Sequence, residues 1–187
     1  MDWSELAVNL RFVPPAPFLA TVLPRLPAQG RALDVACGAG RNARALARHG
    51  LRVDALDRDF EALRVVAEIA ARERLPVHPA CVDLEDAAHA YPFPPARYDV
   101  VVVFRYLWRP RFADIVAALA PGGFLVYETY TTGQLRFADG PRRADFLLRP
   151  GELPGLAGDL HILVHDESDG PGEATARLFA QRRPENP

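Results

Sequence analysis

The 187-residue sequence predicts an α/β fold, with a doubly wound sheet in one domain that spans residues 1–187. Strand-like and helix-like segments alternate from residue 31 onward, which favours a mostly parallel sheet with helices on both faces. The β-branched run "YDVVVVF" at residues 98–104 is typical of a strand buried on both faces. The last two strand-like segments have no helix between them, so they predict an antiparallel C-terminal hairpin strand.

Each element follows from a local signal. Strands are predicted, in chain order, at 31–37, 51–57, 77–83, 98–104, 124–130, 161–167 and 175–181. In the N-terminal helical segment, residues 1–29, prolines in the first turn predict a helix over 15–23. Further helices are expected over 41–49, from the cap Asp59 to about residue 74, over 111–119 and over 151–156.

Three details of these elements are specific enough to check. In the helix after Asp59, helical spacing predicts a core face made of Leu63, Val66, Ala67 and Ala70. The helix over 111–119 is expected to end at the proline and glycines of 121–123. The loop-like segment 131–148 is longer than a routine connection and is therefore a candidate substrate lid, whereas the proline-rich stretch 92–95 predicts an ordinary loop.

The composition excludes several classes of function. A net charge of −2 gives no overall preference for nucleic acid or a membrane, and no apolar run is long enough to span a bilayer. The sequence has no lysine, which excludes Schiff-base chemistry and a P-loop lysine. All 22 basic residues are arginine, so a single arginine is weak evidence of function.

Cysteine and histidine spacing gives no sign of a disulfide framework or a metal site. Cys37 and Cys81 are far apart in the sequence, and the histidines, including His89, show no ligand spacing. The first residues lack the basic and apolar stretches of a signal peptide. We therefore expect a cytoplasmic protein that is a monomer or a homodimer.

The stretch "LDVACGAGRN", residues 33–42, leads from a strand through a glycine turn into a helix. The turn fits the dinucleotide pattern G-x-G-x-x-A, which by itself is a weak signal. Asp34 precedes the turn, where a carboxylate opposes a pyrophosphate but attracts an ammonium group. S-adenosylmethionine has an ammonium, a carboxylate and a sulfonium and no phosphate, so it suits this turn better than NAD.

Two further acids follow the next two strands. Asp57 closes the second strand, where a carboxylate can accept both ribose hydroxyls. Asp83 closes the third, where it can accept from an adenine amino group while the Leu84 N–H reaches a ring nitrogen. A single acid is more often a helix cap or a solvated loop residue. Three acids at successive strand ends around one glycine turn favour a nucleoside cofactor.

These motifs resemble a known family. "LDVACGAGRN", "VDALDRD", "CVDLED", "YDVVVVFRYLWRP" and "LAPGGFLVYETY" follow, in order, the motifs of class I S-adenosylmethionine-dependent methyltransferases. The Gly-x-Gly-Arg-Asn form is similar to the tellurite-resistance and thiopurine-type small-molecule branch. The resemblance covers residues 30–182 and implies a Rossmann-like, seven-stranded sheet.

The resemblance also implies roles for individual residues. The methionine part of the cofactor would be held by Asp34, Ala36, Cys37, Gly38, Gly40 and Asn42. Asp57 with Arg58 would hold the ribose, Asp83 with Leu84 the adenine, and Phe104 and Arg105 would flank the methyl donor. Ala36 departs from the family pattern, in which a glycine is common. Its methyl group is small, so we expect cofactor binding to persist.

The acceptor is expected beyond the strands at 98–104 and 124–130, next to Arg105, Tyr106, Glu128, Tyr130 and Arg149, with Trp108 and Arg109 in the same stretch. Tyr106 and Trp108 also fit helix–sheet packing, Glu128 can accept a proton or pair with an arginine, and Arg149 can orient an acidic substrate or cap a helix. Alignment and exclusion of water supply much of the catalysis of methyl transfer, so no catalytic base is assigned.

The sequence favours S-adenosylmethionine-dependent methyl transfer to a small molecule by in-line displacement. The arginines of segment 131–148 favour an anionic acceptor, and a solvated loop in an arginine-rich protein is the alternative. An RNA or protein methyltransferase is the first rival function. A non-catalytic S-adenosylmethionine-binding regulatory or scaffold protein is the second. An NAD oxidoreductase is disfavoured by Asp34 and by the terminal hairpin.

Overall fold

The computed structural model describes residues 13–86 and 93–184. The chain divides into two compact units, unit 1 (residues 1–88) and unit 2 (residues 89–187). The strands form a seven-stranded sheet with the order β3-β2-β1-β4-β5-β7-β6, in which β7 is antiparallel to its neighbours. This order confirms the predicted α/β class, the mostly parallel seven-stranded sheet and the antiparallel hairpin strand.

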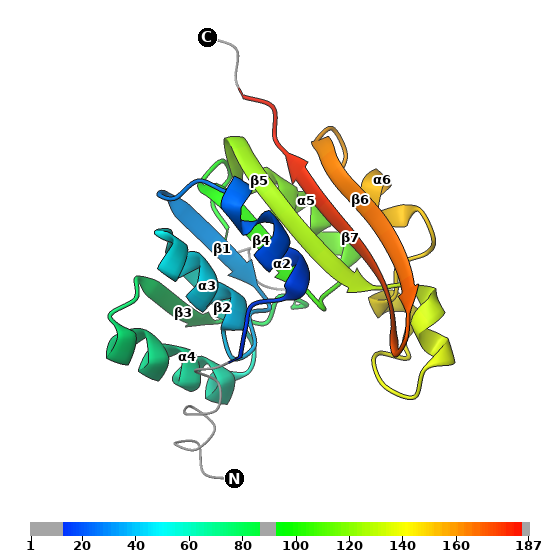
Figure 1. The fold of residues 1–187 in the computed structure, drawn as a ribbon, viewed down its shortest axis with the longest axis horizontal. Coiled ribbons are helices and arrows are strands. Elements are labelled where there is room, and N and C mark those ends of the chain that lie inside the picture. The colour runs from blue at the N-terminus through cyan, green and yellow to red at the C-terminus, as the bar shows by residue number, and fades with distance from the viewer. Residues whose placement is uncertain (1–12, 87–92, 185–187) are drawn as a thin grey trace. The chain divides into compact units, whose positions relative to one another are not determined.

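Unit 1 contains parallel strands joined by helices. Its elements are α2 (Pro17–Val22), β1 (Arg31–Val35), α3 (Arg41–His49), β2 (Arg52–Asp57), α4 (Phe60–Glu73) and β3 (Val77–Cys81). Helix α3 packs on β1 and β2, and α4 packs on β2 and β3 (Figure 1). In the parallel register, Asp34 pairs with Ala55 and Asp57 with Cys81. The carboxyl ends of β1, β2 and β3 therefore share one edge of unit 1.

Two helices of unit 1 begin or end where their sequence signals predicted. Helix α3 ends at Gly50, whose φ of 116° is a left-handed conformation that favours glycine. Helix α4 begins after Asp59, whose side chain accepts the N–H groups of Glu61 and Ala62.

Two helix predictions in unit 1 were wrong in detail. The helix expected over 15–23 begins at Pro17, because Ala16 precedes a proline and is extended; a 3-10 turn, Leu23–Arg25, follows it. In α4, Ala67 is exposed, and Val65 and Ile69 are buried instead. The buried face of α4 extends toward Val65 and Ile69, so Ala67 lies beyond its other edge.

Unit 2 begins with a buried parallel strand and ends with a hairpin. Its elements are β4 (Tyr98–Phe104), α5 (Phe112–Ala117), β5 (Leu119–Tyr130), α6 (Glu152–Leu156), β6 (His161–Gly170) and β7 (Glu173–Gln181). The four central valines of β4 are completely buried, as the sequence predicted. Strand β7 pairs antiparallel with both β5 and β6.

The predicted helix over 111–119 was wrong at its end. Helix α5 stops at Ala117, and β5 begins at Leu119 and includes the proline and glycines of 121–123. Leu119 lies opposite Tyr98, and a Cβ on Gly123 would lie 2.8 Å from the Tyr98 carbonyl oxygen. The glycine therefore permits a close strand contact here, rather than ending a helix.

The segment predicted as a lid, residues 131–148, contains local structure. Two 3-10 helices, Thr132–Arg136 and Ala144–Phe146, lie within it, and a β-bridge joins Thr131 to Leu148. Its role as a lid stays a prediction. His89 and Pro92 lie outside the described residues. Within the described part of the chain, no helix has the length and apolar character needed to cross a membrane.

Candidate functional site

The turn between β1 and α3 has three residues in the left-handed region. Ala36, Gly38 and Gly40 have φ angles of 55°, 53° and 76°. The Cys37 N–H donates to the Leu56 carbonyl at 2.9 Å, which ties the turn to β2. A Cβ built on Gly38 would meet no other part of the chain within 4 Å. The backbone at Gly38 is therefore open to the close approach of a ligand.

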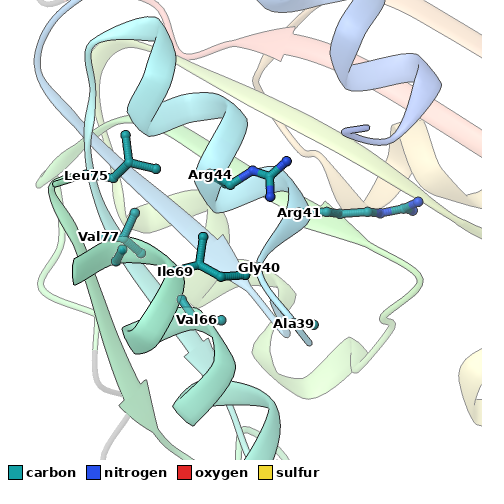
Figure 2. A pocket seen from close by; sticks show the side chains of 9 residues that line it. Ala39, Gly40, Arg41, Arg44, Val66, Ile69, Leu75 and Val77 are labelled. Atoms are coloured by element: carbon teal, nitrogen blue, oxygen red, sulfur yellow. The ribbon is translucent and has the colours of Figure 1, made fainter. Parts of the chain in front are cut away.

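Gly40 faces the interior of unit 1. A Cβ at this position would lie 2.7 Å from Val66 Cγ2 of α4, so Gly40 permits close packing of the turn on that helix. Figure 2 shows the apolar residues behind the turn, among them Val66, Ile69 and Val77. The gap between them has a volume of about 10 Å³, which is room for one water molecule at most. This gap is therefore too small for a cofactor, whereas the Gly38 side of the turn is open.

Asp34 is buried beneath this turn, with 1% of its surface exposed. Its Oδ2 accepts the Ala43 N–H at 2.8 Å, in the first turn of α3. Burial raises the pKa of Asp34 to about 7, and the bond from Ala43 opposes that rise. Asp34 thus fixes the start of α3. Its predicted attraction for the ammonium group of a cofactor stays a prediction.

Asp57, at the end of β2, lies next to Gly38 of the turn. Its Oδ2 accepts the Gly38 N–H at 2.7 Å, and its Oδ1 accepts the Asp59 N–H at 2.9 Å. A carboxylate has about four lone-pair positions, so both oxygens can accept further hydrogen bonds. Asp57 is therefore positioned beside the open backbone of Gly38 and has the capacity to accept two ribose hydroxyls.

The other predicted cofactor residues have partners of their own. Asn42 is buried, and its Oδ1 accepts the Ala16 N–H at 2.9 Å, which holds the start of α2 against α3. Asp83 is exposed, and its Oδ1 accepts the Glu85 N–H at 2.9 Å, as a turn cap does. Leu84 beside it is buried. Cofactor contacts by these residues stay predictions.

Arg58 and Cys37 show no sign of a reactive role. Arg58 is largely exposed, with its Nη1 3.8 Å from Glu85 Oε1. Burial raises the pKa of the Cys37 thiol, with the nearby carboxylates of Asp34 and Asp57 adding to the effect. Cys37 is therefore a neutral thiol rather than a nucleophilic thiolate at neutral pH.

In unit 2, three of the predicted acceptor residues come together where β4 and β5 end. Arg105 follows the buried Phe104, and its backbone has a φ of 60°, which is unusual for a residue other than glycine. Its guanidinium lies 4.5 Å from the centre of the Tyr130 ring, and its Nη2 lies 3.5 Å from Glu128 Oε1. Glu173, on β7, joins them by accepting hydrogen bonds from Arg105. No sequence signal distinguished Glu173.

The remaining predicted residues form a second, separate network. Arg109 donates from Nε and Nη2 to the two carboxylate oxygens of Glu152, at 2.6 and 2.7 Å, and also to the carbonyls of Asp145 and Leu147. These bonds lower the pKa of Glu152. Arg149 is exposed, and its backbone N–H donates to the same carboxylate. Arg109 and Arg149 thus hold the end of segment 131–148 to the start of α6.

Tyr106 and Trp108 lie next to this network. The Tyr106 carbonyl accepts the Tyr127 hydroxyl at 2.7 Å, and burial raises the pKa of Tyr127. The Trp108 ring lies 6.4 Å from that of Phe146. These contacts fit the packing interpretation, and a contact of Tyr106 with an acceptor stays a prediction.

The arginines of segment 131–148 also have partners within unit 2. Arg136 pairs with Asp169 at 2.9 Å and Arg143 with Asp145 at 3.0 Å. Arg142 donates to three backbone carbonyls of its own segment. Within the described residues, no three His, Cys, Asp or Glu side chains lie close enough together to hold a metal ion.

Comparison with known proteins decides the family. A family model described as a methyltransferase domain matches residues 32–123, which include the glycine turn, Asp57, Asp83 and Arg105. Residues 32–123 thus form a methyltransferase domain, and the sheet has the strand order of the class I S-adenosylmethionine-dependent methyltransferases. S-adenosylmethionine is the methyl donor of this family, in agreement with the cofactor that the sequence predicted.

Two curated relatives are longer than this methyltransferase chain. Hemagglutinin 1 of Eikenella corrodens is 33% identical over 164 residues, which cover 82% of this chain and 50% of that protein. A ubiquinone biosynthesis O-methyltransferase of Burkholderia multivorans is 31% identical over 154 residues, which cover 71% of this chain and 65% of that protein. The chain thus spans half to almost two thirds of the length of these relatives.

Two solved structures share the fold. The [4+2]-cyclase SpnF superposes with a TM-score of 0.71 at 19% identity, over 89% of this chain and 80% of that one. TehB from Haemophilus influenzae superposes with a TM-score of 0.70 at 21% identity, over 89% and 61%. A cyclase with this fold illustrates that the fold alone does not determine the reaction.

Proposed function

We propose that this chain transfers the methyl group of S-adenosylmethionine to a small-molecule acceptor by in-line displacement. The observation that carries the proposal is Gly38, whose backbone is open to a ligand directly beside the Asp57 carboxylate. The printed name of the Burkholderia relative, an O-methyltransferase of ubiquinone biosynthesis, supports a small-molecule acceptor.

The residues present fit the cofactor. The turn at Gly38 would take the methionine part, Asp57 would accept the ribose hydroxyls, and Asp83 with Leu84 would contact the adenine. When bound, the cofactor supplies a methyl carbon activated by its sulfonium. The chain's own contribution is to align the acceptor with that carbon and to exclude water from it.

The acceptor is proposed to react through a neutral, protonated atom. Arg136, Arg142 and Arg143 are three of the arginines that favoured an anionic acceptor, together with Arg105, Arg109 and Arg149, and each of the three contacts a carboxylate or carbonyls of unit 2. With the support from these three reduced, we choose an acceptor that carries a hydroxyl, thiol or amine. Such a group must lose a proton during methyl transfer, which gives a role to a nearby carboxylate.

Calorimetry with a matched pair of glycine variants tests the cofactor site. Gly38 in the turn and Gly122 in β5 both have positive φ, 53° and 80°, and a Cβ on either meets no atom within 4 Å, so alanine at either position adds left-handed strain without a clash. We expect S-adenosylmethionine and S-adenosylhomocysteine to bind the wild type at micromolar concentrations, and NAD to bind far more weakly. Gly38→Ala should weaken that binding about tenfold or more, and Gly122→Ala should leave it unchanged.

Equal affinity in the wild type and Gly38→Ala would remove this turn from the cofactor site. Tighter binding of NAD would favour an oxidoreductase. With labelled S-adenosylmethionine, transfer to small-molecule fractions is expected to exceed transfer to bulk RNA or protein. The reverse result would favour an RNA or protein methyltransferase, and tight cofactor binding without transfer to any fraction would favour a regulatory or scaffold protein.

A further inference from the structure

Glu173, the first residue of β7, makes the shortest contacts of the Arg105 side chain. Arg105 Nη2 donates to Glu173 Oε1 at 2.9 Å and to Oε2 at 2.8 Å. The same nitrogen lies 3.5 Å from Glu128 Oε1. One guanidinium is thus shared between two carboxylates, and Glu173 has the closer position.

The carboxylate with the weaker contact is the more buried one. The side chain of Glu128 is 10% exposed and that of Glu173 is 49% exposed. An arginine stabilises a buried carboxylate more than an exposed one, because less solvent screens the charges. Arg105 would therefore be expected to bind Glu128, unless Glu173 holds it in its present place.

The charged groups near Glu128 come from the end of β4 and from β6 and β7. On β7, Arg177 lies opposite Glu128 in the register, and its Nη2 is 2.7 Å from Asp166 of β6. Arg105 comes from the end of β4, Glu173 from β7, and the Tyr130 ring from β5 covers the Arg105 guanidinium. A carboxylate that lies near other carboxylates binds its proton more tightly than an isolated one.

We propose that Glu173 is a positioning residue for acceptor deprotonation, because its closer contacts draw the Arg105 guanidinium toward Glu173, weaken the pairing of Arg105 with Glu128 and so keep the Glu128 carboxylate basic. This inference rests on the proposed function. The acceptor atom gives its proton to Glu128, and its electron pair forms the new bond to the methyl carbon. The carbon–sulfur bond breaks with its electrons staying on sulfur, which turns the sulfonium into a neutral thioether. Glu128, now a carboxylic acid, releases its proton to water.

A carboxyl NMR titration tests the positioning role without an acceptor. The protein is labelled with ¹³C-glutamate, and the Glu128 signal is assigned with Glu128→Gln. In Glu173→Gln, Arg105 is expected to move onto Glu128, so the Glu128 titration midpoint should fall by about 1 pH unit. Glu173→Asp keeps the negative charge and should restore part of the shift. The control is Glu73→Gln, which breaks a 2.8 Å pair with Arg48 in unit 1 and should leave the midpoint unchanged.

A double-mutant cycle tests whether Glu173 acts through Arg105. In an Arg105→Gln background, Glu173→Gln should shift the Glu128 midpoint only slightly. A shift as large as in the wild type would mean that Glu173 acts directly. An unchanged or raised midpoint in the single variant Glu173→Gln overturns the positioning role, whether or not the protein transfers methyl groups.

Kinetics with an acceptor tests the chemical part of the proposal. Glu173→Gln should lower kcat about threefold to tenfold, and move the acidic limb of the pH–rate profile to lower pH. S-adenosylmethionine affinity should stay unchanged. An unaltered kcat and pH profile would remove Glu128 from proton transfer. A wild-type protein that binds no S-adenosylmethionine would overturn the proposed function, and the NMR result would still decide the positioning of Arg105.

Discussion

The two units hold their central carboxylates in opposite ways. In unit 1, Asp34 accepts a backbone N–H from Ala43, 9 residues away, and burial raises its pKa to about 7. In unit 2, Glu152 accepts two guanidinium N–H groups from Arg109, 43 residues away, and these bonds lower its pKa. The proposed cofactor turn thus depends on backbone donors that are close in sequence. The network near the predicted acceptor residues depends instead on side chains that are far apart in sequence.

This difference indicates which contacts all members of the family can share and which contacts can differ from one member to another. Backbone N–H groups are present whatever the sequence, so a turn that depends on them tolerates substitution of most neighbouring side chains. A network of side-chain ion pairs changes with every residue that it contains. We infer that acceptor specificity in this chain depends on unit 2, where a single substitution alters charge and geometry together.

The largest expected effect concerns the pH dependence of Asp34. Its folded pKa of about 7 lies above the unfolded value of about 3.9, so the native state keeps a proton that the unfolded state has released. The free energy of unfolding should therefore fall as pH rises from 5 to 8, by about 2–3 kcal/mol from this group. Urea unfolding of the wild type and Asp34→Asn at several pH values measures this contribution.

The asparagine variant keeps an oxygen for the Ala43 N–H and cannot ionise. Groups distant from Asp34 titrate alike in both proteins, so the pH dependence of the difference between their unfolding free energies comes from Asp34 and the groups next to it. We expect the unfolding free energy of Asp34→Asn to lie below that of the wild type by a smaller amount at pH 8 than at pH 5. A difference that is constant with pH would mean that Asp34 is ionised throughout, as Glu152 is, and the contrast between the units would disappear.

Glu152 should show the opposite pH profile. Its folded pKa is lowered, so its stabilising effect is fully present above the unfolded pKa and is lost only as pH falls through the folded pKa. Glu152→Gln should cost about 2 kcal/mol, constant from pH 5 to 8, because charge-assisted bonds from Arg109 are lost. Chemical denaturation measures the cost, and calorimetry should show unchanged affinity for S-adenosylmethionine.

A weaker ion pair in the same unit provides the control for Glu152. Asp114 lies 3.5 Å from Arg111, three residues earlier in the sequence, and its side chain is 44% exposed. Asp114→Asn should cost less than about 0.5 kcal/mol. Equal costs for the two variants would show that the two bonds from Arg109 to Glu152 add nothing beyond a surface ion pair.

The sequence predicted which residues come together at the unit 1 turn better than which residues surround Arg105 in unit 2, and sequence separation explains why. The bond from Gly38 to Asp57 joins residues 19 apart in one strand–turn–helix–strand unit, so motif spacing alone places them together. Arg105 and Glu173 are 68 residues apart and meet only after β7 has paired with β5. Before that pairing, Glu173 resembles any exposed acid in a hairpin turn.

The boundaries of the helices and strands were likewise predicted only where the signal is local in sequence. The ends of α3 follow from glycines at its two ends, which are local signals. The start of β5 was missed because Pro121 and the glycines after it normally end an element. There, Leu119 lies opposite Tyr98 on β4, a contact that no local pattern contains. Local chemistry thus predicted helix caps and turns, and tertiary pairing determined the remaining boundaries.

The smallest expected effect compares two alanines with nearly equal backbone strain. Ala36 in the cofactor turn has a φ of 55°, and Ala96 in a turn of unit 2 has a φ of 53°. Glycine removes the left-handed strain of about 1–2 kcal/mol, and part of that gain is offset by the greater freedom of glycine in the unfolded chain. Ala36→Gly and Ala96→Gly should each stabilise the protein by up to about 1 kcal/mol in chemical denaturation.

The two variants should differ only in their affinity for S-adenosylmethionine. Ala96→Gly should leave S-adenosylmethionine affinity unchanged, whereas Ala36→Gly should change it by less than about fivefold, because a methyl group in the turn is worth less than about 1 kcal/mol of contact. A larger gain in affinity for Ala36→Gly would show that the strained alanine holds the turn away from its best binding geometry. In that case the affinity of the proposed cofactor site in unit 1 would depend on a side chain as well as on backbone N–H groups. Unit 1 would then resemble unit 2 more closely in its dependence on side chains.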